Sequence, residues 1–296
     1  MNLYFFGNMI NYASLVMIAA CANCFSLKNS QMNLGGEAQI YAGGFAASVA
    51  CTFFWSKGFS PVSILLAAAF CAGFAGFLSA FLSGIFKYFK NVPELLTSFL
   101  FSAGTIPLID GLIAGKFRIK EGNLLATEFL AENLRLKKLL PPSCFNVTFF
   151  WGIFFCLAAA FLIFRTNFGR RLEIYGKARE FSISSGFSRF FWETVPFSIS
   201  GFFHGLTGFF ATTGTYYTCH SGFYAGMGWN ALSICLIAKS NPIIVIPVSL
   251  AYSLLYSLGT QSSLAGTTGF DLPSLIQGAA LISIAVIYRT SAEKNS

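Results

Sequence analysis

Apolar runs of about 20 residues recur along the chain, and short polar segments separate them. A helix of about 20 residues crosses the roughly 30 Å hydrocarbon core of a bilayer, where every backbone polar group must be paired within the helix. The pattern therefore predicts an all-α polytopic membrane protein. The predicted spans are residues 9–27, 34–55, 61–86, 93–114, 147–164, 194–213, 242–258 and 272–288.

A further apolar segment, residues 224–238, is shorter than a span and glycine-rich at its start. We expect a partial or broken crossing there, which gives about nine membrane segments. Their directions form two inverted four-segment halves with broken helices, as in inverted-repeat transporters. The predicted parts of this single transmembrane domain are a first half (1–114), an external loop (115–146), a linking span (147–164), a cytoplasmic loop (165–193), a second half (194–288) and a cytoplasmic tail (289–296).

Composition supports the membrane assignment. The 296 residues include 19 basic and 11 acidic side chains, so 10% are charged and 55% are hydrophobic. A soluble domain carries roughly 25% charged residues. Basic residues gather in the segments assigned to the cytoplasm, so the net charge of +8 is mainly an orientation signal and does not indicate nucleic-acid binding. The N-terminus is then outside and the C-terminus is in the cytoplasm.

The sequence gives little indication of a disulfide, a metal site, a cofactor or a nucleotide site. Cys21 and Cys24 lie inside an apolar run, where thiols act as packing residues. The two histidines, His204 and His220, match no metal-ligand spacing, and no cofactor motif is present. No P-loop occurs, so the chain is predicted to be non-catalytic, and any ATP hydrolysis must take place on another subunit.

Two segments combine glycine with polar side chains at membrane depth. In residues 33–39, Asn33, Glu37 and Gln39 follow or flank two glycines, which indicates a substrate pathway; the alternative is capping of a helix at the interface. In residues 222–242, glycines precede Trp229 and Asn230, and Asn241 precedes a proline. This pattern favours a broken helix at a substrate site, although close packing of a glycine-rich crossing is the alternative.

His204 and the glycines near it are interpreted as packing and hydrogen-bonding residues between helices. The cytoplasmic loop 165–193 mixes basic and apolar residues, which predicts a short helix lying flat on the membrane face against a partner protein; the alternative is a solvated basic loop. The candidate contact residues are Phe168, Arg170, Arg171, Gly176, Phe181, Ile183 and Gly186.

Four motifs in order resemble one known family. Asn33, Gly35, Glu37 and Gln39 match a signature similar to N-I-G-x-E-G-Q, and residues 165–187 resemble the coupling segment of the same proteins. Residues 200–208 and 228–242 complete the match. Together they resemble permease subunits of bacterial ABC importers in the branched-chain amino acid, ribose and nucleoside permease superfamily, and are most similar to its riboside branch.

The resemblance implies ATP-driven import of nucleosides, purine ribosides in particular, across the bacterial inner membrane by alternating access. It also implies an ATP-binding subunit, a second and longer permease in a heterodimer, and an extracytoplasmic substrate-binding lipoprotein. A simple sugar such as ribose or galactose is the alternative substrate. An ion-coupled secondary transporter and a membrane scaffold are alternatives of other classes.

Overall fold

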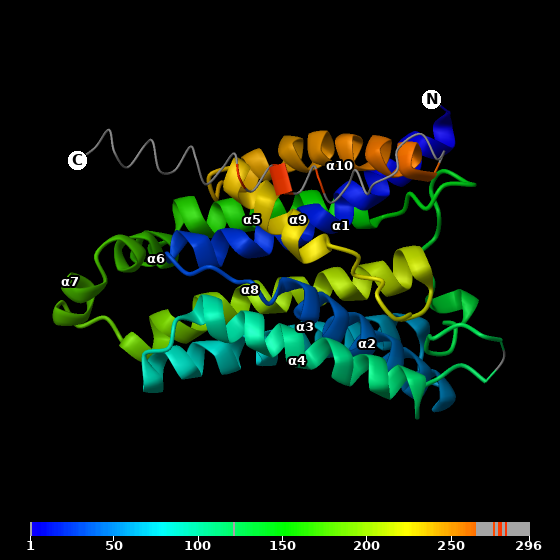
Figure 1. The fold of residues 1–296 in the computed structure, drawn as a ribbon, viewed down its shortest axis with the longest axis horizontal. Helices are drawn as coiled ribbons and strands as arrows, with labels where there is room; N and C mark the ends of the chain where they lie inside the picture. Colours follow the sequence, from blue (N-terminus) through cyan, green and yellow to red (C-terminus); the bar gives the residue numbers. More distant parts are fainter. Residues whose placement is uncertain (1, 121, 265–274, 276–277, 280–281, 283–296) are drawn as a thin grey trace.

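The computed structural model describes residues 2–120 and 122–264, together with residues 275, 278, 279 and 282. Helices are the regular elements of this described part, as Figure 1 shows. They are α1 (Leu3–Lys28), α2 (Gly36–Ser56), α3 (Pro61–Lys90), α4 (Glu94–Ala114), α5 (Thr148–Arg165), α6 (Asn167–Lys177), α7 (Arg179–Ser184), α8 (Arg189–Ala211), α9 (Met227–Ile237) and α10 (Pro242–Leu264), with short 3-10 and π turns at Glu132–Leu134 and Thr212–Tyr216.

Five of the described helices are long and apolar enough to cross a membrane: α1, α3, α4, α5 and α10. α2 and α8 have spanning length, with 21 and 23 residues, but they are not among these five apolar helices. α9 has 11 residues and reaches about 16 Å at 1.5 Å per residue, which is too short for a full crossing. The predicted span 272–288 and the tail 289–296 fall almost entirely outside the described residues, so the count of nine segments is not confirmed.

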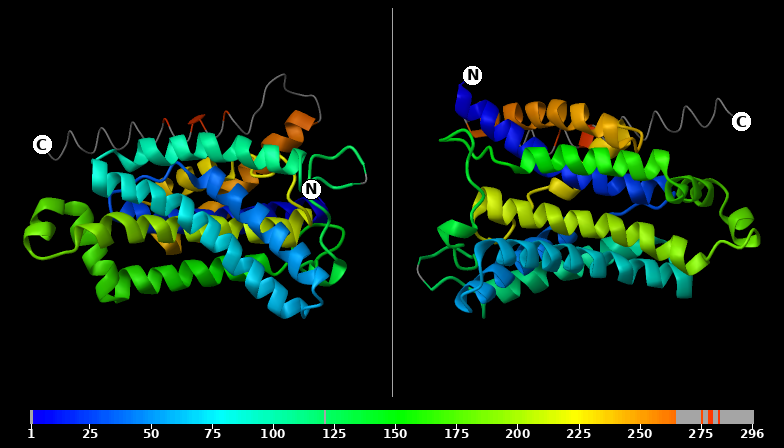
Figure 2. Two further views of the ribbon diagram at one scale, coloured as in Figure 1. Left: turned by 90° about the horizontal axis from the view of Figure 1, so that it is seen from below. Right: turned by 180° about the vertical axis from the view of Figure 1, so that it is seen from behind.

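α8 lies between two groups of helices. Figures 1 and 2 show α1, α5, α9 and α10 on one side of it and α2, α3 and α4 on the other. The N-terminus and the loop 115–146 lie at one end of the molecule, and α6 and α7 lie at the opposite end. This arrangement agrees with the predicted placement of the two longest polar loops on opposite sides.

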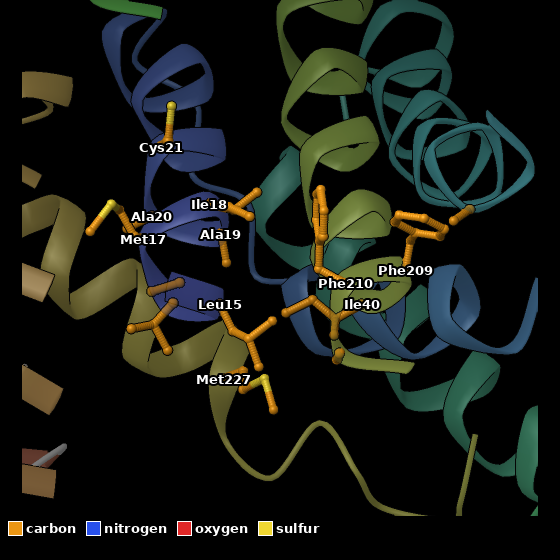
Figure 3. Close-up of a cluster of buried hydrophobic side chains, with 14 of the residues drawn as sticks. Leu15, Met17, Ile18, Ala19, Ala20, Cys21, Ile40, Phe209, Phe210 and Met227 are labelled. Carbon is orange, nitrogen blue, oxygen red and sulfur yellow. The ribbon is translucent and has the colours of Figure 1, made fainter. Parts of the chain in front are cut away.

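Burial differs sharply among the spanning helices. The most apolar window of α1 is 83% buried, whereas those of α3, α4, α5 and α10 are 28–33% buried. Figure 3 shows the reason, because Leu15 and Ile18 of α1 meet Ile40 of α2, Phe210 of α8 and Met227 of α9 in one core. The outer helices instead expose large apolar side chains, as expected where lipid is the solvent.

Small residues set the contact between α3 and α8. A β-carbon at Gly76 would lie 2.8 Å from the backbone nitrogen of Gly205, and one at Gly205 would lie 2.9 Å from the carbonyl carbon of Ala72. The two backbones approach this closely only because side chains are missing there. The packing interpretation of these glycines is confirmed.

Candidate functional site

Two helices begin next to each other inside the molecule. α2 begins at Gly36, and α9 begins one residue before Gly228. A β-carbon at Gly228 would lie 2.5 Å from the backbone nitrogen of Glu37 and 2.8 Å from the carbonyl carbon of Gly36. The two N-termini therefore meet at a contact that leaves no room for a side chain, and their positive ends favour a polar or anionic group there.

Glu37 is half-buried at this contact, in the first turn of α2. The backbone groups of Gly228 and Trp229 lie toward its carboxyl group, while its Oε1 atom is buried without a hydrogen bond of good geometry. The position suits a pathway residue. It also suits the alternative of a carboxylate favoured by a helix N-terminus, so the role of Glu37 stays a prediction.

The other polar residues of this segment bind one another. Asn33 Nδ2 donates to Gln39 Oε1 at 2.9 Å and to Ser200 Oγ at 3.1 Å, and Asn33 Oδ1 accepts from the Gly35 backbone nitrogen at 2.9 Å. Gln39 Oε1 lies 2.9 Å from His204 Nδ1, so His204 is hydrogen-bonded between helices as predicted. This amide network holds the non-helical backbone before α2 in place and ties α2 to α8.

Several buried polar atoms beside this network lack hydrogen bonds. They include His204 Nε2, Glu37 Oε1 and both side-chain atoms of Asn23. The Ala19 backbone lies beside the His204 ring, and Asn23 follows it by one turn on the same face of α1. An unsatisfied buried polar atom costs about 1–3 kcal/mol, so a cluster of them is a candidate site for a polar ligand. The sequence analysis did not single out Asn23, although an amide inside an apolar run is a usable signal.

The remaining predicted pathway residues are spread along α9 and beyond it. Trp229 is half-buried at the start of α9. Asn230 is buried: its Nδ2 donates to Tyr12 Oη and its Oδ1 accepts from Tyr252 Oη, both at 2.7 Å. Asn241 caps α10, since its Oδ1 accepts from a backbone nitrogen two residues later at 3.0 Å. The structure therefore does not bring Asn241 into the cluster at the helix N-termini.

The second candidate site is the pair of short helices α6 and α7, at the end of the molecule opposite the N-terminus. The sequence predicted one short helix bounded by Gly176 and Gly186. The structure instead breaks the segment at Ala178, whose non-helical backbone separates α6 from α7, and it places Gly176 inside α6. Gly186, with a φ angle of +87°, lies just after α7. The exposed members of the predicted contact set are Arg170, Arg171, Phe181 and Gly186.

The other three predicted contact residues face inward. The Phe168 ring stacks on Trp192, with centroids 5.6 Å apart, and Ile183 packs against the same small core. A β-carbon at Gly176 would lie 2.5 Å from the Lys28 carbonyl oxygen and 2.9 Å from the carbonyl carbon of Asn29. These three residues are half-buried and fix α6 and α7 to the rest of the protein.

A fully buried carboxylate anchors the helix pair. Glu193 Oε1 accepts from Arg179 Nε at 2.9 Å and also contacts Arg179 Nη2, while Glu193 Oε2 lies 3.1 Å from Arg189 Nε. Tyr175 Oη lies 3.4 Å from the same carboxylate, and Arg189 also contacts Asn91 at the end of α3. This Glu193 cluster joins α7, α6, α8 and α3. The sequence analysis missed it, because most of its partners are far apart in the sequence.

Burial and the charge of Glu193 shift the pKa values of its neighbours Tyr175 and Arg179. Burial and then the charge of Glu193 raise the pKa of Tyr175 to about 12. Burial opposes the charge of Arg179, but the hydrogen bond and charge of Glu193 outweigh it and raise the pKa of Arg179. On the exposed face of α6, the hydrogen bond from Lys177 lowers the pKa of Glu173. At neutral pH the Tyr175 hydroxyl is therefore protonated and the Arg179 guanidinium is charged.

Residues 29–35 form a non-helical strap between α1 and α2, and this strap connects the two candidate sites. Asn29 Nδ2 donates to the Trp192 carbonyl oxygen at 2.6 Å, and Gln31 Nε2 donates to the Glu193 carbonyl oxygen at 2.9 Å. The strap begins where Gly176 of α6 packs and ends at the amide network. Its side chains therefore follow α8 from α6 and α7 to the contact between the helix N-termini.

Comparisons with known proteins agree with this architecture. The family model described as branched-chain amino acid transport system / permease component matches residues 5–285. A probable riboflavin import permease protein of Treponema pallidum is 33% identical over 91% of this chain and 71% of that protein. A guanosine ABC transporter permease protein of Bacillus subtilis is 24% identical over 82% of this chain and 70% of that protein. A glucose ABC transporter permease protein of Haloferax volcanii is 22% identical over 90% of this chain and 72% of that protein.

The family model and these relatives, together with the apolar spanning helices, identify the class of this protein as a multi-pass membrane permease of an ABC importer. Within that class, the chain belongs to the family of branched-chain amino acid transport system permease components. The family resemblance predicted from the motifs is confirmed. The named relatives differ in solute, with a vitamin, a nucleoside and a sugar among them.

Proposed function

We propose that this chain moves neutral nucleosides, purine ribosides in particular, across a bacterial cytoplasmic membrane as a permease subunit of an ABC importer. The observation that carries the proposal is the meeting of two helix N-termini at Gly36 and Gly228, beside the unpaired polar atoms of Asn23, Glu37 and His204. Helix ends at a repeat interface are where transporters bind solute. Because a nucleoside is neutral at pH 7, Glu37 acts on it through hydrogen bonding.

The proposed mechanism uses the strap as the link to ATP. A separate ATP-binding subunit contacts the exposed surface of α6 and α7, around Arg170, Arg171 and Phe181. Movement of α6 reaches the strap through Gly176, which packs on its first residues. The strap then shifts the amide network and the start of α2 relative to α9, which changes access to the interior.

The assembly that we propose contains three further components. These are the ATP-binding subunit, a second and longer permease that forms a heterodimer with this chain, and an extracytoplasmic substrate-binding lipoprotein. The N-terminus and the loop 115–146 face outward, and α6 and α7 face the cytoplasm. Cysteines introduced at Lys120 and Ser184, in a background without other cysteines, test this orientation. A membrane-impermeant maleimide applied to intact cells should label the first position only, and the reverse pattern contradicts the orientation.

Riboflavin is a second candidate substrate, favoured by the relative that is 33% identical. A simple sugar is a third, favoured by the glucose permease. Flavins and purines are both planar and heteroaromatic, whereas sugars are not, so the substrates can be separated experimentally by ring type.

Uptake into proteoliposomes tests the proposal. The complete transporter would be reconstituted, and ATP-driven uptake of labelled guanosine, adenosine, riboflavin, ribose and galactose would be compared with uptake by a transporter whose ATPase subunit cannot hydrolyse ATP. We expect nucleoside uptake that requires hydrolysis. Uptake of riboflavin alone, or of sugars alone, contradicts the nucleoside assignment. Uptake driven by an ion gradient without ATP contradicts the whole class and supports a secondary transporter.

A further inference from the structure

A pocket of about 390 Å³ lies between the beginning of α1 and the end of α10, at the end of the molecule opposite α6 and α7. Four aromatic side chains line it, Tyr4, Phe5, Tyr12 and Tyr256, together with short polar side chains such as Asn8. We call it the tyrosine pocket. None of its described lining residues is Asp, Glu, Lys, Arg or His. It is separate from the contact between the helix N-termini.

Two of the four aromatic rings that line the tyrosine pocket stack on each other. Tyr12 and Tyr256 are stacked, with ring centroids 4.5 Å apart and an angle of 10° between the planes. Tyr4 is 52% exposed, and Phe5 is half-buried. Because Tyr12 and Tyr256 cover each other's inner faces, a planar ligand would stack on an outer face of this pair. The amides provide hydrogen-bond donors and acceptors for the edge of such a ligand.

Hydrogen bonds connect the pocket to the interior. Tyr12 Oη accepts from Asn230 Nδ2 at 2.7 Å, and Asn230 is also held by Tyr252. Asn230 lies in the first turn of α9, two residues after Gly228, whose backbone touches Glu37. On the outer side, Asn8 Oδ1 accepts from the Cys144 backbone nitrogen at 2.9 Å. The pocket is thus braced by α9 on one side and by the loop 115–146 on the other.

The lining discriminates among classes of small molecule. An anion or a metal ion finds no opposite charge among the described lining residues, and burying a charge without a partner is costly. The lining consists of four aromatic rings and several short amide or hydroxyl side chains, so a simple sugar would find hydrogen bonds but would not use the flat aromatic faces as a planar ring does. A neutral, planar heteroaromatic ring matches both the stacked tyrosines and the amides at the rim. Small-molecule sites commonly combine an apolar lining with a few placed polar groups.

We propose that the tyrosine pocket binds a neutral planar heteroaromatic ring system, such as a purine base, as a first station on the solute's route to the contact between α2 and α9. This inference rests on the proposed function, since it assigns a ring type to the solute that the permease moves. It also predicts that sugar without a base does not occupy the pocket.

Photolabelling tests the inference on the complete transporter in lipid nanodiscs. The probe is 8-azidoadenosine, and peptides that carry the label are identified by mass spectrometry. We expect label in peptides that contain residues 2–12 or 252–261, competed by guanosine or riboflavin but not by ribose. Label that is absent from these peptides overturns the inference, as does label that ribose or a long-chain detergent displaces equally well.

Variants give a second measurement. Tyr256→Ala removes one stacked ring and should lower labelling of the pocket about tenfold, since stacking of a base on an aromatic side chain is worth about 1–3 kcal/mol. Tyr256→Phe keeps the ring and should label normally, which controls for folding. Tyr88→Ala removes a tyrosine far from the pocket, beside Phe190 and Arg189, and should also label normally. Equal labelling of Tyr256→Ala and the unaltered protein overturns the inference.

The two proposals fail in different ways. If the pocket is labelled but proteoliposomes take up no nucleoside or flavin, the pocket binds a heteroaromatic ring and the proposed transport function is wrong. If nucleoside uptake is normal but the label maps elsewhere and Tyr256→Ala has no effect on labelling, the transport function stands and the tyrosine pocket is not a binding site.

Discussion

The Glu193 cluster allows a specific prediction about stability, because its carboxylate is buried whereas its two arginines are partly exposed. The Glu193 side chain is 0% exposed, whereas those of Arg179 and Arg189 are 36% and 31% exposed. If both arginines are replaced by methionine, the carboxylate stays buried without a cation. If Glu193 is replaced by glutamine, the arginines keep contact with water. The first change should therefore cost much more stability than the second.

The magnitudes follow from the energetics of buried charge. Removing the partners of a buried ion costs about 3–5 kcal/mol, and we expect this for Arg179→Met/Arg189→Met. For Glu193→Gln we expect about 1–2 kcal/mol, since the amide keeps part of the hydrogen bonding and the arginines remain partly hydrated. The triple variant with Glu193→Leu removes the charge as well, and should recover most of the stability lost in the arginine pair.

Thermal unfolding of the purified transporter in detergent tests this ranking of the three variants by stability. We expect the arginine pair to lower the Tm by on the order of 10 °C, Glu193→Gln by a few degrees, and the triple variant by a similar few degrees. ATP-driven uptake should fall in all three, because the anchor of α6 and α7 is altered. If the arginine pair is no worse than Glu193→Gln, or if the triple variant does not recover, Glu193 is not held as a buried carboxylate and the reasoning fails.

Three further predictions concern the contact between helix N-termini, the helices α6 and α7, and the buried amide of Asn23. Gly228→Ala should abolish uptake, because its β-carbon would meet the backbone of α2, whereas Gly111→Ala, with no neighbour within 4 Å, should transport normally; equal uptake by both contradicts the contact. Phe181→Glu should leave the Tm unchanged and uncouple ATP hydrolysis from uptake, while Ile183→Glu should lower the Tm, because Ile183 packs inward. Asn23→Leu should keep or raise the Tm, since it removes unpaired buried polar atoms, yet lower uptake; normal uptake would show that Asn23 does not face the pathway.

The positions of the spanning helices could be predicted because lipid imposes a simple rule on composition and length. Their ends were less predictable. α8 begins at Arg189, five residues before the predicted start, because Ser188 caps the helix and its first five residues include the charged side chains of Arg189 and Glu193. Hydropathy places such polar residues outside a span, although the helix itself continues.

The sites were predictable only in part. The glycines and Glu37 could be found from the sequence, because polar and glycine residues at membrane depth are unusual. The inward direction of Ile183 could not, because it depends on the break at Ala178 and on the rotation of α7. The Glu193 cluster needed the fold, since Arg179 and Glu193 are 14 residues apart and belong to different helices.

The deep burial of α1 has a consequence for how the protein is made. The helices that cover α1, namely α5, α8, α9 and α10, all follow it in sequence, and α8 begins 161 residues after α1 ends. At roughly 5–20 residues per second, the ribosome needs about 10–30 s to deliver α8. For most of that time the amides of Asn11 and Asn23 lack the neighbours that later bury them, and these amides must be sheltered from lipid. Even Asn146, which bonds Asn11, and α5 follow α1 only at or after the end of the long loop 115–146. Insertion of this permease therefore depends on a host for α1, such as the translocon or a membrane chaperone, until its partners arrive.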